Sequence, residues 1–155
     1  MHALDVALAF LRDNFPTVRE ALTGGPVALA WAAGGLRIAG WLKVSRQWKT
    51  GYTRKVFHFL IFASAVAVHV RWGTRGVCLF GVMTSAVVFH AVVRGPGYPP
   101  YEALAREKDA PHRSHFILAP WFATLVGGLA SNLVAPAAAA VGYLVTGLGD
   151  ALAEP

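Results

Sequence analysis

GYTRKVFHFLIF, residues 51–62, joins two cations to the start of a long apolar run. On an α-helix Arg54 and Lys55 lie four and three residues before His58, so the three side chains share one face. This face is at the end of an apolar segment, where the lipid headgroups of a bilayer begin. Basic residues in this place are commonly anchors that extend to the interface. A histidine one turn deeper needs a polar partner and is therefore a candidate site residue.

The composition is typical of a membrane protein. Hydrophobic residues make up 55% of the sequence and charged residues only 14%, whereas soluble domains carry about 25% charged residues. The net charge of +6 comes from cations beside apolar runs. This placement favours anionic headgroups or phosphate-bearing substrates as partners and argues against nucleic acid. The single cysteine, Cys78, excludes an internal disulfide and a CxxC metal site, and we interpret it as a packing residue.

The order of polar and apolar segments predicts an all-α fold, a polytopic membrane helix bundle. Residues 1–24 carry apolar side chains at helical spacing, which predicts an amphipathic helix at the membrane interface, bent or divided at Pro16. The Gly-Gly-Pro at residues 24–26 predicts the end of this segment. Residues 25–155 form the membrane domain, with five expected spans at about 27–44, 56–70, 76–93, 116–133 and 136–149.

The last two spans are inferred from length. No Lys, Arg, Asp or Glu occurs in residues 116–149. As one helix this stretch would measure roughly 50 Å, against a hydrocarbon core of about 30 Å. We expect the break at SNLVAP, residues 131–136. Before it, residues 94–115 form the long polar stretch, in which three prolines exclude a helix at the start and residues 101–108 are expected to form a short surface helix.

The distribution of cations predicts the orientation of the bundle. Lys and Arg are concentrated in residues 43–55 and 94–113, so the positive-inside rule places both segments in the cytoplasm and the N-terminus outside. We expect the protein in the bacterial inner membrane with its active face cytoplasmic. Arg37 lies within the first span, where it is expected to extend to the interface or to meet an anion.

GDALAEP, residues 149–155, is the second candidate stretch. Asp150 and Glu154 are four residues apart, so on a helix both carboxylates point the same way. Such a pair suits a hard cation such as Mg²⁺ that carries nucleotide phosphates. The alternative is that Asp150 caps a turn and Glu154 is solvated.

The combination of RKVFH at residues 54–58 and GDALAEP at residues 149–155 resembles the polyprenol kinase group. These are the CTP-dependent kinases of phytol, farnesol and dolichol, distantly similar to phosphatidate cytidylyltransferases. The resemblance covers about residues 50–155. It implies an integral membrane enzyme that transfers phosphate from a nucleotide, CTP, to a long-chain isoprenoid alcohol at the cytoplasmic face.

The candidate residues fall into three sets. The resemblance implies that the catalytic set belongs to the catalytic region, where cations would offset phosphate charge. It also implies that the metal set holds Mg²⁺ with the nucleotide. The nucleotide-binding set lies at the start of the fourth span on the same face. The sets are, for catalysis, Arg54, Lys55 and His58; for binding the nucleotide, Arg113 and His115; and for the metal, Asp150 and Glu154.

The sequence also departs from the pattern of this group. There the Gly-Asp-x-x-Ala element is followed by a Gly- and Lys-rich segment and by further spans, whereas this sequence stops at Pro155. No GxxxxGK[ST] loop occurs. We therefore expect that a missing C-terminal half or a partner chain completes the site.

Two other classes stay open. A bis-histidine haem protein would use His58 with His69 on one helix face, or His58 with His90 of the next helix at similar depth. A non-catalytic membrane scaffold or assembly subunit would need none of the candidate site residues. Absorbance spectra would test the first class, and titration with Mg-CTP would test the second.

Overall fold

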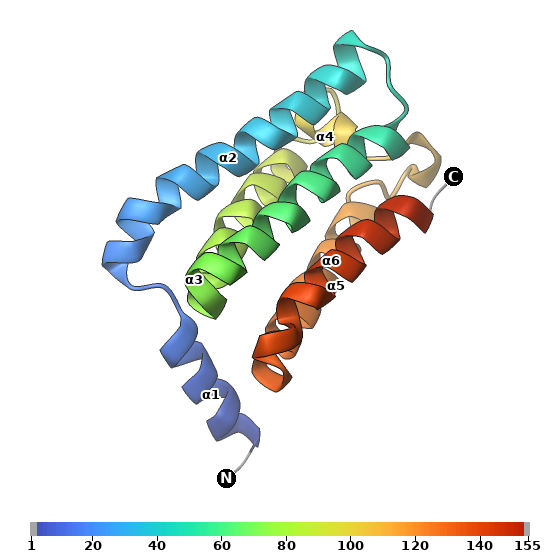
Figure 1. Cartoon of the computed structure of the whole chain (residues 1–155). Helices are drawn as coiled ribbons and strands as arrows, with labels where there is room; N and C mark the ends of the chain where they lie inside the picture. Colours follow the sequence, from blue (N-terminus) through green and yellow to red (C-terminus); the bar gives the residue numbers. More distant parts are fainter. Residues whose placement is uncertain (1–2, 154–155) are drawn as a thin grey trace.

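The computed structural model describes residues 3–153, and among these it contains helices and no strand (Figure 1). The predicted all-α fold is therefore confirmed. In chain order the elements are α1 (Ala3–Asn14), α2 (Val18–Ser45), α3 (Thr50–Arg94), α4 (Pro99–Leu104), the 3₁₀ helix η1 (Glu107–Asp109), α5 (His115–Val134) and α6 (Pro136–Ala153).

Three of the described helices, α2, α3 and α5, are long and apolar enough to cross a membrane. The apolar part of α6, Pro136–Gly147, is shorter. Large apolar side chains are exposed on the outer faces of these helices; Phe59 is 51% exposed and Phe122 62%. Because soluble monomers rarely expose apolar surface on this scale, the helices indicate a membrane protein.

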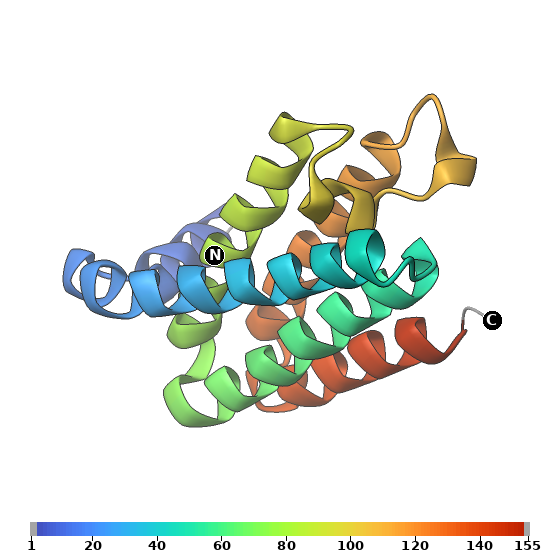
Figure 2. The same cartoon turned by 90° about the horizontal axis from the view of Figure 1, so that it is seen from above.

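α3 is a hairpin of two helical arms. At Gly73 the backbone takes φ 66° and ψ −162°, a conformation that is almost confined to glycine. The chain reverses there, and the first arm, residues 50–72, lies beside the second arm, residues 74–94 (Figures 1 and 2). Phe62 of the first arm and Phe80 of the second belong to one buried cluster. The two arms correspond to the segments predicted at 56–70 and 76–93.

α5 and α6 form a second pair, and the break between them falls where it was predicted. α5 ends at Val134 and α6 begins at Pro136. α6 runs antiparallel to the first arm of α3, because Pro136 O lies 3.1 Å from His69 Nε2 and Gly147 lies against Phe62 at the other end. The two hairpins therefore meet along the first arm (Figure 1).

The N-terminal segment is divided at Pro16, as predicted. Thr17 caps α2: its Oγ1 accepts a hydrogen bond from Glu20 N at 3.3 Å, and Glu20 Oε2 accepts one from Thr17 N at 2.8 Å. This capping box satisfies backbone groups that the first helical turn leaves without partners.

The helix end predicted at residues 24–26 is wrong, because α2 continues through Pro26 to Ser45. Gly24 and Gly25 pack against the second arm of α3, where an added Cβ would lie 3.0 Å from a methyl group of Leu79 and 3.2 Å from that of Met83. This close packing compensates for the backbone hydrogen bond that is lost at an internal proline.

The expected surface helix at 101–108 is also wrong in its bounds and its exposure. α4 begins at Pro99, since the first turn of a helix tolerates proline, whose missing N–H would have no intrahelical partner there. α4 is buried, with Tyr101 only 2% exposed. It packs on α2 at Gly40, where an added Cβ would lie 2.8 Å from the carbonyl carbon of Pro99.

Candidate functional site

The polar segments gather at one end of the bundle. The loop at residues 46–49 and the segment at residues 95–114 lie at the same end as the last turn of α6, whereas the reversals at Gly73 and Ala135 lie at the opposite end (Figures 1 and 2). Residues 43–55 and 94–113, which carry nine of the 14 Lys and Arg residues of the sequence, are therefore neighbours in space.

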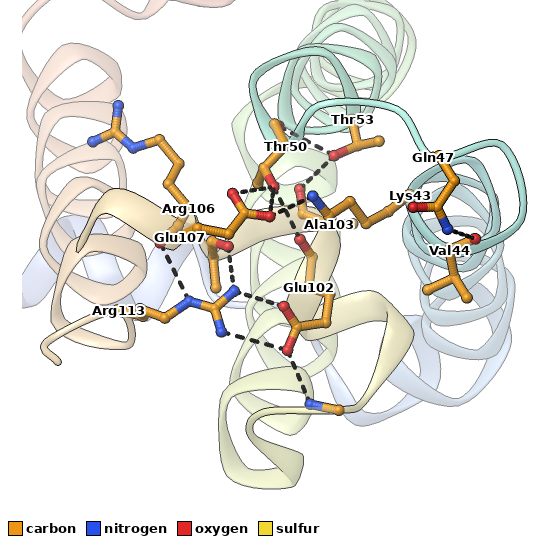
Figure 3. Close-up of polar contacts among 12 residues, drawn as sticks. Lys43, Val44, Gln47, Thr50, Thr53, Glu102, Ala103, Arg106, Glu107 and Arg113 are labelled. Atoms are coloured by element: carbon orange, nitrogen blue, oxygen red, sulfur yellow. Dashed lines mark hydrogen bonds and ion pairs between the residues drawn. The ribbon is translucent and has the colours of Figure 1, made fainter. Parts of the chain in front are cut away.

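A hydrogen-bonded network joins these segments (Figure 3). Lys43 Nζ donates to Glu107 Oε1 at 2.5 Å, and Thr50 Oγ1 lies 3.3 Å from both carboxylate oxygens of Glu107. The buried Thr53 donates its hydroxyl to Ala103 O at 2.8 Å. Glu107 thus connects α2, α3 and the polar segment, and the hydrogen bond from Lys43 is the main reason that its pKa lies below the ordinary value of 4.5.

Arg113 holds the polar segment together from within. Its Nη2 donates to Glu102 Oε2 (Figure 3) and to Ala105 O, each at 2.6 Å. Its guanidinium lies over the ring of Tyr101, 5.3 Å from the ring centroid. Burial raises the pKa of Glu102, but the hydrogen bonds from Arg113 and from Gly97 N lower it, and the net pKa is below the ordinary value. The guanidinium predicted to bind nucleotide is therefore engaged within the segment.

An apolar cavity of about 440 Å³ lies between the two arms of α3 and α5. The α5 lining extends from Phe116 to Asn132, which is about 24 Å at roughly 1.5 Å per residue. Phe10 of α1 and Phe15, which follows the helix, also line the cavity, and the end of α1 lies near the Gly73 reversal, where Arg75 Nη2 donates to Asp13 O at 2.6 Å. The cavity is thus long, narrow and almost as deep as a membrane span.

Two of the predicted catalytic residues, Arg54 and His58, line this cavity at the polar end of the bundle. The ring of His58 stacks on Phe62 with 5.6 Å between centroids, and both Arg54 and His58 are half-buried. Arg54 makes no hydrogen bond or ion pair with the side chains that the structure describes. Lys55 is half-buried on the same helical turn and is not among the residues that line the cavity.

The predicted metal ligands lie at the same end of the molecule. Counting along α6 from Gly147, which faces Phe62, the backbone of Asp150 lies near the level of His58 on the first arm. The side chain of Asp150 and all of Glu154 lie outside the described residues. Within the described part of the chain, no three His, Cys, Asp or Glu side chains come close enough to hold a metal ion.

The remaining histidines are dispersed. His90 lines a second cavity, between α2 and the second arm, whereas His58 lines the first. His69 Nε2 is hydrogen-bonded to Pro136 O, and His115 is exposed with its ring edge-on to that of Phe116. The described structure therefore does not bring together the histidine pairs that a haem site would require.

Several features of this end have no clear signal in the sequence. Spacing alone does not indicate that Lys43 and Glu107 are partners, because 64 residues separate them. The presence of Glu102, Glu107 and Asp109 among the cations of the polar segment was a usable sign of internal ion pairs, two of which form with Arg106 and Arg113. The contribution of α1 to the cavity depends on tertiary packing.

No family model, curated protein or solved structure matches this chain. The class of the protein is therefore defined by its own residues. It is a helical membrane protein with a deep apolar cavity whose polar end carries Arg54 and His58.

Proposed function

We propose that this protein is an integral membrane kinase that phosphorylates a long-chain isoprenoid alcohol. The observation that carries this proposal is the apolar cavity, which lies along α5 and has Arg54 and His58 at the polar end of the bundle. A long hydrocarbon chain can pass from the bilayer into such a cavity without loss of apolar surroundings, because the lining is as apolar as the lipid. Its hydroxyl group would then lie beside a cation and a candidate base.

In this proposal the side chains at the polar end position the reactants and neutralise charge. His58 accepts the proton of the alcohol, the alcohol oxygen forms a bond to the γ-phosphorus of CTP, and the bond from that phosphorus to the β-phosphate oxygen breaks, releasing CDP. Arg54 and Lys55 offset the phosphate charge. Mg²⁺, held by Asp150 and Glu154, would supply further positive charge to the phosphates.

His115, the first residue of α5, and Arg113, which precedes the helix, are proposed to contact the nucleotide. Because Arg113 is hydrogen-bonded to Glu102, it would bind a nucleotide only through the N–H groups that remain. We further propose that a C-terminal segment or a partner chain supplies the remaining nucleotide contacts.

The proposed topology follows from the two ends of the bundle. The two arms of α3 count as separate spans, and together with α2, α5 and α6 they give five, with α1 at the interface. The polar end, which carries the 43–55 and 94–113 cations, is proposed to face the cytoplasm of a bacterium, with the N-terminus outside. CTP would reach this end from water, and the alcohol would enter from the bilayer.

The test is transfer of labelled γ-phosphate from CTP to phytol or farnesol by membranes that contain the chain. Arg54→Ala should lower the turnover at least tenfold, since a charge-assisted contact with phosphate contributes about 1.5–3 kcal/mol. Arg71→Ala is the matched control: Arg71 is exposed and lies near Gly73, at the opposite end. Its turnover should equal that of the unmodified chain.

Asp150→Asn should abolish the transfer and leave membrane insertion unchanged. Transfer that does not depend on the presence of the chain, or an unchanged rate in both Arg54→Ala and Asp150→Asn, would contradict the kinase proposal.

A further inference from the structure

A second cavity, of about 340 Å³, lies on the other side of the bundle between α2 and the second arm of α3. Its apolar wall includes Leu29 and Ala33 of α2 and Val87 of α3. Leu29 is 40% exposed at its edge, so the cavity opens to the surroundings of the helices. None of the residues that line it also lines the first cavity.

Arg37 supplies a cation to this cavity. It is exposed on α2, eight residues before Ser45, which is about 12 Å from the helix end. Arg37 forms no ion pair with the side chains that the structure describes. A cation within a membrane span is costly without an anionic partner, even when its long side chain extends towards the interface.

No carboxylate side chain that the structure describes serves as the anionic partner of Arg37. Five of them are held by other partners, and Asp5 lies in α1, near the opposite end of the bundle. The five pairs are Asp13 with Arg12, Glu20 with Arg75, Glu102 with Arg113, Glu107 with Lys43 and Asp109 with Arg106.

Further polar groups lie at the same end of the cavity. His90 and Tyr98 line it, with their rings edge-on at 5.9 Å between centroids. Arg94 lies over the ring of Tyr98 at 5.2 Å, which places a second cation beside Tyr98 at the polar end of the bundle. The cavity thus combines an apolar wall with cations and hydrogen-bonding groups at the polar end of the bundle, where headgroups lie.

We propose that this cavity binds an anionic phospholipid of the surrounding bilayer. Arg37 contacts the phosphate, with His90 and Tyr98 beside it, and an acyl chain lies along Leu29 and Ala33. The apolar wall favours a phospholipid over free phosphate, because inorganic phosphate has no group to place against it. The site is independent of the proposed kinase activity, since it uses neither Arg54 nor His58.

The test measures which lipids stay bound to the full chain in mixed detergent micelles, by native mass spectrometry. With equal amounts of phosphatidylglycerol and phosphatidylcholine, the unmodified chain should retain phosphatidylglycerol preferentially. Arg37→Gln should reduce this retention about tenfold, as expected for the loss of one charge-assisted contact. Arg37→Lys should keep part of it, and Arg71→Gln, which removes a charge near the opposite end, should keep all of it.

Two further measurements separate the possible ligands and guard against unfolding. Ala33→Leu fills the apolar wall and leaves Arg37 in place, so it should also weaken retention of phosphatidylglycerol. Inorganic phosphate at millimolar concentration should not displace the lipid. Equal retention by Arg37→Gln and the unmodified chain, equal losses in Arg37→Gln and Arg71→Gln, or displacement by inorganic phosphate would each overturn the proposal.

Discussion

At the scale of single residues, Gly73 determines how α3 folds. Its φ of 66° and ψ of −162° lie in a region that residues with a Cβ rarely enter. An added Cβ would meet no other atom within 4 Å, so the cost of a side chain there is torsional and not steric. A substitution at Gly73 therefore tests the backbone conformation of the hairpin without introducing a steric clash.

We expect Gly73→Ala to lower the free energy of unfolding by about 1–3 kcal/mol, the usual cost of this backbone region for a residue other than glycine. Gly34→Ala is the control, because Gly34 is within α2 and an added Cβ there also has no atom within 4 Å. That substitution should be neutral or slightly stabilising. Denaturant unfolding in detergent measures the free energy of unfolding of both variants. Equal stability of the two variants would contradict the hairpin geometry.

Arg54 and Arg113 show what can be inferred from a residue type and what cannot. Each arginine lies close to the end of an apolar segment in the sequence, and each was predicted to serve a phosphate site. In the structure Arg54 lines the apolar cavity, whereas Arg113 binds Glu102 and Ala105. Partners that lie eight or eleven residues away, across an irregular loop, cannot be inferred from helical spacing.

At the scale of elements, residues 95–114 form a clamp over the polar end of the bundle. Glu107 ties them to α2 and α3, and the pair of Glu102 and Arg113 closes them internally. Both carboxylates have a pKa below the ordinary value of 4.5. For Glu107 the main cause is the hydrogen bond from Lys43. For Glu102 burial raises the pKa, but the hydrogen bonds from Arg113 and Gly97 lower it by more. The clamp should therefore depend on pH.

A carboxylate whose pKa is lower in the folded chain than in the unfolded chain stabilises the fold above the unfolded pKa, and this contribution is lost as the pH falls through the folded pKa. We expect the thermal unfolding temperature in detergent to fall as the pH is lowered from about 5 to about 3.5. Glu107→Gln should already be less stable at neutral pH and should show a smaller decrease on acidification. An identical pH dependence in Glu107→Gln would contradict the role of Glu107.

The elements differ in how well the sequence predicts them. The break near residue 135 and the division at Pro16 follow from local rules on length and proline, and both are confirmed. The predicted break at residues 24–26 failed because Gly24 and Gly25 are packing surfaces for Leu79 and Met83. The burial of α4 likewise depends on its contact with Gly40, which no local pattern indicates.

At the scale of the whole molecule, the main feature is the cavity that is lined by the two hairpins and α1. It is lined by side chains from α1, α3, α5 and α6, so it exists only when the hairpins are assembled. The sequence predicted Arg54 and His58 as candidate residues at a membrane face. The cavity beside them was not predicted, because its walls come from segments far apart in the chain.

Filling the cavity should prevent binding of the alcohol without unfolding the bundle. Gly81 lines the cavity, and a Cβ added there meets no atom within 4 Å, so Gly81→Leu places bulk in the cavity at little steric cost. We expect at least tenfold weaker binding of a long-chain alcohol, measured by the change in tryptophan fluorescence, since Trp121 lines the same cavity.

Gly142→Leu is the matched control for this measurement. Gly142 is exposed on α6, an added Cβ there also has no atom within 4 Å, and the residue does not line the cavity. Its affinity for the alcohol should equal that of the unmodified chain. Unchanged affinity in Gly81→Leu would place the alcohol elsewhere.

Photocrosslinking locates both ends of a bound alcohol directly and does not require turnover. One probe carries a diazirine beside the hydroxyl group of a long-chain isoprenoid alcohol, and the other carries it at the far end of the chain. The hydroxyl-end probe should label residues 54–58 and Phe116, and the tail-end probe should label residues near Asn132 or α1, as mapped by mass spectrometry. The reverse pattern, or labels confined to the lipid-facing surface, would show that the alcohol does not bind in the cavity with its hydroxyl group at Arg54 and His58.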